Sequence, residues 1–183
     1  TIKADVITHS TVISACDQLM LWEQALDGLQ VMRLRRVAAD ALTFATVIRA
    51  CDKGGQWEVS LSLLASALEH GMADTSVFNA TMSAQARCHE WARALWLLRL
   101  MPARDLFSYT AAISGCERRG SWSLCLSILE EAWRCALPPN IIGYRSVVRA
   151  CGSAANWEAA VGVFGQMQQH EVPDSDGSAV SAL

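Results

Sequence analysis

The chain has 183 residues, of which 52% are hydrophobic and 18% are charged, and its formal net charge is −3. This composition excludes an intrinsically disordered chain, and the acidic balance argues against duplex binding driven by a large basic field. No apolar run reaches the roughly 18 residues that a membrane-spanning helix needs, and no secretory signal begins the chain. The first residue is Thr1 rather than Met, which indicates a fragment or a processed chain.

A tryptophan recurs along the chain at a nearly fixed interval. The steps are 35, 34, 31 and 35 residues, between Trp22, Trp57, Trp91, Trp122 and Trp157. A small residue follows three positions after each of them, at Ala25, Ser60, Ala94, Cys125 and Ala160. An aromatic residue or a histidine precedes each of them by thirteen positions, at His9, Phe44, Phe78, Tyr109 and Tyr144. A fixed period of this length is typical of stacked helical repeats.

Each repeat is predicted to be a helical hairpin. Residues 44–51 place apolar side chains at i, i+3, i+4 and i+7, which is one face of an amphipathic helix. Residues 57–68 form a second such face after the Gly54-Gly55 break. We therefore expect a helix A, a short turn and a helix B that begins at the Trp. The small residue would let the two helices approach, and the Trp would cover the gap between repeats, so all five tryptophans are expected in the core.

The linkers carry residues suited to turns and helix caps. Thr8 and Thr43 stand where an N-cap would start helix A. An Asp or Asn lies in each linker before the next helix A, at Asp40, Asp74, Asp105, Asn140 and Asp174. The third repeat is shorter than the first, 31 residues against 35. We place this loss in the linker from Met101 to Tyr109, where Pro102 would stop the helix.

The seven cysteines invite a zinc or disulfide interpretation. No C-x-x-C pair and no Cys/His cluster has zinc-ligand spacing, so no metal is expected. Four of the cysteines recur at one place in helix A, at Cys16, Cys51, Cys116 and Cys151. Equivalent helices in a stack lie about 8–10 Å apart, which is too far for a disulfide. We expect reduced thiols that serve as small buried hydrophobes, which favours a reducing compartment.

The segment "VITHSTVISACDQLMLWEQALDGLQVMRLRRVAAD" resembles a pentatricopeptide repeat. That family has an aromatic and a polar residue near the start of helix A, an Ala-Leu pair and a Met in helix B, and a Pro-Asp or similar ending. "MPARDLFSYTAAISGC" is similar to the boundary after the family's short repeat variant. The expected array is all-α, with repeats at about 6–40, 41–74, 75–105, 106–140 and 141–174 and a tail at 175–183. The resemblance implies a right-handed α-solenoid.

The resemblance also implies sequence-selective binding of single-stranded RNA, one base per repeat, in RNA processing, editing or stability in a mitochondrion or plastid. In the family, the fifth and last residues of a repeat read the base. Here these pairs are Ser10 with Asp40, Ala45 with Asp74, Asn79 with Asp105, Thr110 with Asn140, and Arg145 with Asp174. The second residue packs on the base, which here is Ile7, Leu42, Ser76, Phe107 or Ile142.

The family's code implies a base for three repeats. Asn79 with Asp105 would favour U, Thr110 with Asn140 would favour A, and the first pair leans toward G. Ala45 and Arg145 fall outside the usual set, so their repeats are expected not to discriminate. Candidate phosphate contacts lie on helix A and the turn after it, at Arg49, Lys53, Arg87, Arg118, Arg119 and Arg149. Each Asp or Asn has a second interpretation, as a helix cap alone.

No catalytic constellation is present in the sequence. The four histidines lie at different phases, and Cys88 and His89 are adjacent, so their side chains diverge on a helix. We therefore expect no enzyme activity, cofactor, metal, small-molecule substrate or membrane contact, and RNA with other RNA-processing proteins as partners. The alternative function is a scaffold that holds a peptide, as tetratricopeptide repeats do. That family places its Trp in the first helix, whereas here the Trp opens helix B.

Overall fold

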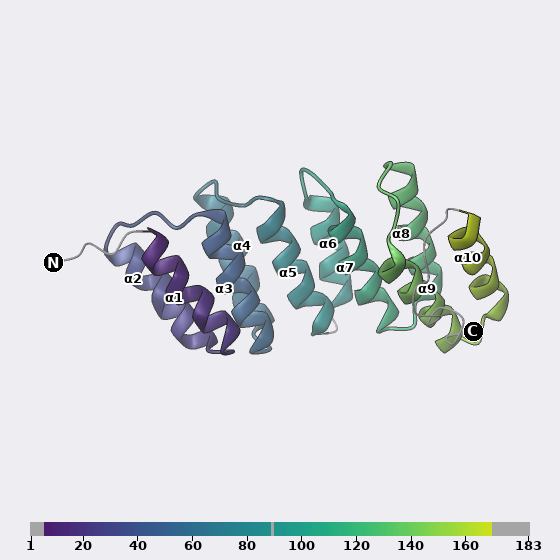
Figure 1. The fold of residues 1–183 in the computed structure, drawn as a ribbon, viewed down its shortest axis with the longest axis horizontal. Helices are drawn as coiled ribbons and strands as arrows, with labels where there is room; N and C mark the ends of the chain where they lie inside the picture. The colour runs from purple at the N-terminus through teal and green to yellow at the C-terminus, as the bar shows by residue number, and fades with distance from the viewer. Residues whose placement is uncertain (1–5, 89, 170–183) are drawn as a thin grey trace. The chain divides into compact units, whose positions relative to one another are not determined.

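The computed structural model describes residues 6–88 and 90–169, and A and B helices alternate along these ranges (Figure 1). The A helices are α1 Val6–Gln18, α3 Ala41–Lys53, α5 Thr75–Arg87, α7 Leu106–Glu117 and α9 Ile141–Ser153. The B helices are α2 Trp22–Leu34, α4 Trp57–Glu69, α6 Trp91–Leu100, α8 Trp122–Arg134 and α10 Trp157–Gln169. The predicted all-α fold is confirmed, and every B helix begins at its Trp.

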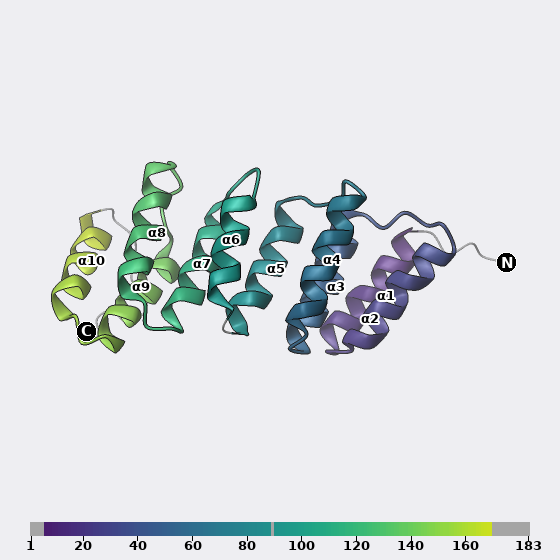
Figure 2. The same ribbon diagram turned by 180° about the vertical axis from the view of Figure 1, so that it is seen from behind.

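The chain divides into two compact units, of which the first holds α1 to α5 and the second holds α6 to α10. In the first unit α1 contacts α3 and α3 contacts α5, while α2 and α4 each contact the A helix on either side. Figure 2 shows this unit from behind, with α2 and α4 toward the viewer. The second unit repeats the pattern with α7 against α9 and α8 between them in sequence, in contact with both. In the ranges above, no helix is long and apolar enough to cross a membrane.

Helices α3, α5, α7 and α9 begin after the Asp or Asn residue of the preceding linker. Asp40 Oδ1 accepts a hydrogen bond from the Thr43 backbone N–H at 2.8 Å, and Asp105 forms a capping box with Ser108. Asp74 and Asn140 cap α5 and α9 in the same way. The predicted threonine caps are therefore wrong. Thr8 lies inside α1, and Thr43 stands three residues after the cap, where its N–H is one of the donors that a cap satisfies.

The turn between helices A and B explains the fixed spacing of the Cys and the Trp. The residue two positions before the Trp has a positive φ at Met20, Gly55, Gly120 and Ala155. The N–H that follows it donates to the carbonyl of the recurring cysteine, as from Gln56 to Cys51 at 2.9 Å. This bond closes the end of helix A in the manner of a Schellman motif. Each of these turns therefore fixes where helix B begins, which is one residue after the N–H that donates to the cysteine carbonyl.

Replacing Ala155 with glycine is expected to raise the free energy of unfolding by about 0.5–1 kcal/mol, because the left-handed conformation costs an L-residue more than it costs glycine. The converse change, Gly55→Ala, is expected to lower it by a similar amount, since Gly55 has a φ of 72°. Urea denaturation of both variants measures the difference. A shift of both variants in one direction would contradict this account of the turn.

The small residue of helix B is buried in every repeat, at Ala25, Ser60, Ala94, Cys125 and Ala160. The Trp contacts the next repeat, since a Cβ added to Gly54 would lie 2.4 Å from Trp22 Cδ1, and the Arg119 guanidinium lies 4.9 Å from the Trp91 ring centroid. The expectation that all five tryptophans are core residues is wrong, because Trp157 is 66% exposed and the other four are only half-buried. A Trp at this position is covered by the repeat that follows it.

Helix α6 is shorter than the other B helices, with 10 residues against 13. The prediction from the sequence was that the linker alone is shorter in this repeat, and that prediction is wrong. The helix loses its last turn, because Met101 leaves helical geometry with a ψ of 128°. The residue before a proline is driven toward extended geometry, and Pro102 follows Met101. Arg104 then folds back, and its Nε donates to the Leu98 carbonyl at 2.9 Å.

The seven cysteines are free thiols, and Cys51, Cys116, Cys125 and Cys151 are buried. Burial raises the pKa of Cys51 to about 11, and the neighbouring Cys116 thiol together with burial raises the pKa of Cys125. Protonated, covered thiols react slowly with electrophiles. In the native chain at neutral pH we expect the exposed Cys135 to react with a disulfide reagent first. The four buried thiols are expected to react only on unfolding, as counted by mass spectrometry, and early labelling of Cys51 would contradict the packing.

Candidate nucleic-acid interface

An apolar side chain is exposed in the first turn of four A helices. The residues are Ile7, Leu42, Phe107 and Ile142, and between 54% and 72% of each is exposed. The fifth predicted packing residue, Ser76, is also exposed, and its hydroxyl donates to Asp74 Oδ1 at 2.6 Å. Two positions further along the helix, Phe44, Tyr109 and Tyr144 are buried. The first turn of helix A thus has a core face and an exposed apolar face that the hairpin core does not use.

The predicted reading residue lies one turn after this exposed residue. Ser10 Oγ donates to the Ile7 carbonyl at 3.0 Å, and Thr110 Oγ1 donates to the Leu106 carbonyl at 2.8 Å. Both side chains are half-buried, as is Arg145, whereas Ala45 and Asn79 are buried. A hydroxyl that donates to the backbone keeps lone pairs with which it can accept. The two hydroxyl side chains can therefore still accept a hydrogen bond from a ligand.

The second member of each predicted pair is the N-cap described above. The Asn140 amide must accept from the Gly143 N–H through Oδ1, at 3.0 Å, so its Nδ2 points its donors elsewhere. Asp40 uses Oδ1 for both Thr43 bonds, which leaves Oδ2 as an acceptor. The Thr43 side-chain hydrogen bond is the main cause that lowers the pKa of Asp40. In Asp40 and Asn140 the cap therefore fixes the side chain and leaves one of its polar atoms for another partner.

The structure places most of the predicted pairs on neighbouring helices. Ser10 lies on α1 and Asp40 at the start of α3, and these two A helices are in contact. The same holds for Ala45 and Asp74 across α3 and α5, and for Thr110 and Asn140 across α7 and α9. Asn79 and Asp105 belong to different units, so their pairing stays a prediction. Asp174 lies outside the described residues.

Four of the predicted phosphate contacts form ion pairs between successive A helices. Lys53 Nζ lies 2.9 Å from Asp17 Oδ1, and Arg49 Nε lies 3.6 Å from the other oxygen of Asp17. Arg87 pairs with Asp52 at 3.4 Å, and Arg149 pairs with Glu117 at 2.6 Å. Asp17 and Asp52 are buried, so losing their partner would leave a buried charge uncompensated. These cations thus have a structural role in stacking.

The remaining two candidates differ from each other. Arg119 is exposed and stacks on Trp91, whereas Arg118 is exposed on the helix end without an ion pair among the described residues. The ion pairs between successive A helices were not predicted from the sequence, although the sequence contains a signal for them. An acidic residue stands five positions before the Trp at Asp17, Asp52 and Glu117, and the following repeats offer the cations. Among residues 6–88 and 90–169, no group of three or more His, Cys, Asp or Glu side chains could hold a metal ion.

Tandem helical hairpins, with a polar cap before α3, α5, α7 and α9 and an exposed apolar residue in the first turn of four A helices, define a helical-repeat protein. The PPR repeat family model matches residues 107–135 and 142–172, and the other three hairpins share the phase of these two. The chain is therefore similar to pentatricopeptide-repeat proteins.

Relatives and solved structures agree with this assignment. A chloroplastic pentatricopeptide repeat-containing protein of Arabidopsis thaliana is 28% identical over 82% of this chain and 24% of its own length. Another from the same plant is 26% identical over 91% of this chain and 19% of its own length. The chain thus spans at most about a quarter of the length of these relatives.

Solved structures of two proteins show the same fold. The crystal structure of PPR10 from maize superimposes with a TM-score of 0.76 and 22% identity, and the match covers 100% of this chain and 27% of that one. The PPR domain of Arabidopsis thaliana protein-only RNase P 1, solved in complex with tRNA, gives a TM-score of 0.77 and 11% identity over 93% of both chains. A further structure of PPR10, in complex with an 18-nt psaJ RNA element, gives a TM-score of 0.81 over 99% of this chain, with 20% identity and 28% of that chain covered.

Proposed function

We propose that this chain binds single-stranded RNA and that each repeat addresses one base. The observation that carries the proposal is the exposed apolar residue in the first turn of α1, α3, α7 and α9, beside a half-buried or capping polar side chain. An unstacked base needs an apolar surface for its face and hydrogen-bond partners for its edge. Related structures of this fold hold RNA, namely PPR10 with an RNA element and the RNase P 1 domain with tRNA.

The caps supply a physical reason for base preference. An ionised carboxylate only accepts hydrogen bonds, so a capping Asp favours a base that presents a ring N–H, which is U or G. An amide whose oxygen is held by the helix offers its NH₂ instead, so Asn140 favours a base with a ring acceptor, such as A. This agrees with the family's code for Thr110 with Asn140. The capping and the base-reading interpretations of these residues are therefore compatible, because each uses a different atom of the side chain.

In the cell, the chain would position an organellar transcript so that other proteins process, edit or stabilise it. One relative is named as chloroplastic, which supports an organelle without choosing between plastid and mitochondrion. Because four of the candidate phosphate contacts are in ion pairs, few cations remain for the backbone. The dependence of RNA affinity on salt should therefore be shallow.

Selection from a pool of randomised single-stranded RNA tests this function. We expect enrichment of a short motif with A at the position that Thr110 and Asn140 address. The matched control is the Ile142→Asp variant, which replaces an exposed apolar residue by a charge that repels phosphate and is expected to lose the enrichment. A selection by the unmodified chain at low salt that yields no motif would overturn the proposal. Association with a peptide that persists after ribonuclease treatment would then favour the scaffold function.

A further inference from the structure

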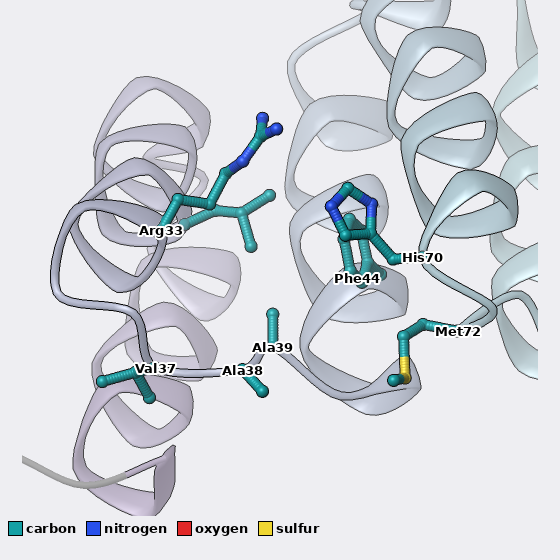
Figure 3. A pocket seen from close by; sticks show the side chains of 8 residues that line it. Arg33, Val37, Ala38, Ala39, Phe44, His70 and Met72 are labelled. Carbon is teal, nitrogen blue, oxygen red and sulfur yellow. The ribbon is translucent and has the colours of Figure 1, made fainter.

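A cavity of about 180 Å³ lies in the first unit, between α2 and the start of α3 (Figure 3). Its walls come from α2, from the linker 37–39, from the start of α3 and from the segment after α4, and they are mostly apolar. The side chains that define it are Leu29, Arg33, Phe44, His70 and Met72. Figure 3 shows His70 beside Phe44 and the Arg33 guanidinium across the opening from both. A buried apolar cavity of about 150 Å³ suffices for one benzene ring, so this one can hold an aromatic side chain.

The repeat period identifies the corresponding place in the second unit. Arg33 stands eleven positions after Trp22, and Trp133 stands eleven positions after Trp122. Likewise Tyr144 corresponds to Phe44, and Leu137-Pro138-Pro139 correspond to the linker 37–39. Trp133 Nε1 donates a hydrogen bond to the Tyr144 hydroxyl at 2.9 Å. The chain therefore places its own indole against the aromatic residue of helix A at this position, where the first unit has an open cavity.

Tyr109 also corresponds to Phe44, because each stands thirteen positions before the Trp of its repeat. Tyr109 is buried, and its hydroxyl donates to Glu131 Oε1 at 3.3 Å. Arg104 Nη1 donates to the same oxygen at 2.9 Å. Phe44 has no hydroxyl, and Arg33 is exposed. The two units thus differ at this place, since the first has Arg33 and Phe44 where the second has Trp133 and Tyr144.

The surface beside the cavity is basic. Arg33, Arg35 and Arg36 are exposed at the end of α2 and in the turn after it. Within the described part of the chain, none of the three forms an ion pair. His70 Nδ1 lies 2.6 Å from the Ser66 carbonyl and must donate to it, which leaves Nε2 for a ligand. An acidic ligand would complement this surface.

We propose that this cavity binds one aromatic side chain of an acidic peptide segment from a partner protein. Trp133, at the corresponding position of the second unit, indicates that an aromatic ring suits this site. The three arginines favour a peptide with acidic residues beside that ring. RNA is the less favoured occupant. Phe44 lines the cavity, whereas Leu42, two positions away and thus about 200° around α3, is the exposed residue of the proposed RNA face. An RNA on that face would lie on the opposite side of the helix.

Fluorescence anisotropy with a labelled acetyl-Asp-Glu-Trp-Asp-Glu peptide tests the inference. We expect 1:1 binding that weakens with salt, and at least about tenfold weaker binding of the same peptide with Ala in place of Trp. The variant Arg33→Trp copies the second unit and should fill the cavity, so it is expected to weaken peptide binding at least about tenfold with no loss of helicity or thermal stability. Arg134→Trp places the same group on α8 and serves as the matched control, with peptide binding within about twofold of the unmodified chain.

Three results would overturn the proposal. They are the absence of binding of the Trp peptide at about 1 mM, equal binding to the Arg33→Trp variant and to the unmodified chain, and binding of a single-stranded RNA, in place of the peptide, that is lost in Arg33→Trp. The outcome is independent of the proposed RNA function, because the variant leaves the exposed residues of the A helices unchanged. Loss of RNA motif selection with retained peptide binding would show that the RNA function fails while the peptide site stands.

Discussion

Replacing Phe107 with alanine is expected to weaken RNA binding by about 5- to 150-fold, because packing of a base on an aromatic ring contributes about 1–3 kcal/mol. The free energy of unfolding should change little, since 58% of the Phe107 side chain is exposed and its removal leaves no cavity. Equilibrium binding to the selected RNA and urea denaturation measure the two quantities. Trp96→Ala is the matched control, because this aromatic residue is 59% exposed but lies on the B helix α6.

Tyr109 provides the opposite case on the same helix. It is buried, so Tyr109→Ala is expected to lower the free energy of unfolding by about 3–5 kcal/mol, as for other large-to-small core changes. Loss of RNA binding in this variant would follow from unfolding. The account of the two faces of α7 would be contradicted if Phe107→Ala destabilised the chain as strongly as Tyr109→Ala, or if Trp96→Ala weakened RNA binding as much as Phe107→Ala.

The double variant Thr110→Asn with Asn140→Asp is expected to change the preferred base at one position from A to U. It copies the residues of the third repeat, and it replaces the amide donor of Asn140 by a carboxylate acceptor. A pair of well-placed hydrogen bonds discriminates by about 1–3 kcal/mol, so each protein should prefer its own base by about 5- to 150-fold. Binding measured to two RNAs that differ only at that position tests the change.

Stability provides the control for this exchange. Asp caps helices as well as Asn does, and Asp40, Asp74 and Asp105 do so in this chain. The double variant should therefore unfold at nearly the same urea concentration as the unmodified chain. Asn140→Ala removes the cap as well as the donor, and we expect it to lose about 1 kcal/mol of stability. A retained preference for A in the double variant would show that Asn140 acts only as a cap.

The periodic features of the fold could be predicted from the sequence. The start of every B helix at its Trp, and the burial of Phe44, Tyr109 and Tyr144, follow from a repeated pattern in which five copies support one another. The exposure of Trp157 could not be predicted in this way. The side chain is identical to the other four, and its burial depends on the repeat that follows it. The length of α6 depends on geometry that Pro102 imposes locally.

Contacts between repeats were harder to predict than the repeats themselves. The partners of Asp17 are Arg49 and Lys53, which lie more than thirty residues away and pair with it only when α1 and α3 stack. The cavity beside Phe44 depends on which residues stand eleven positions after the Trp, and that position varies from Arg33 to Trp133. The candidate site came from the family resemblance, while the exposure of residues such as Phe107 and the second polar atom of Asp40 and of Asn140 came from the structure.

The capping residues have a consequence for redesign of the repeats. Only a few side chains start a helix well, chiefly Asp, Asn, Ser and Thr, and the described A helices whose start can be assigned use Asp or Asn. If the same side chain addresses the base, the choice at that position is limited by folding before any RNA is bound. Lysine or glutamine could reach further toward a base, but either would leave the first turn without its acceptor. The bases that these repeats can distinguish are therefore limited by the small set of side chains that can begin an α-helix.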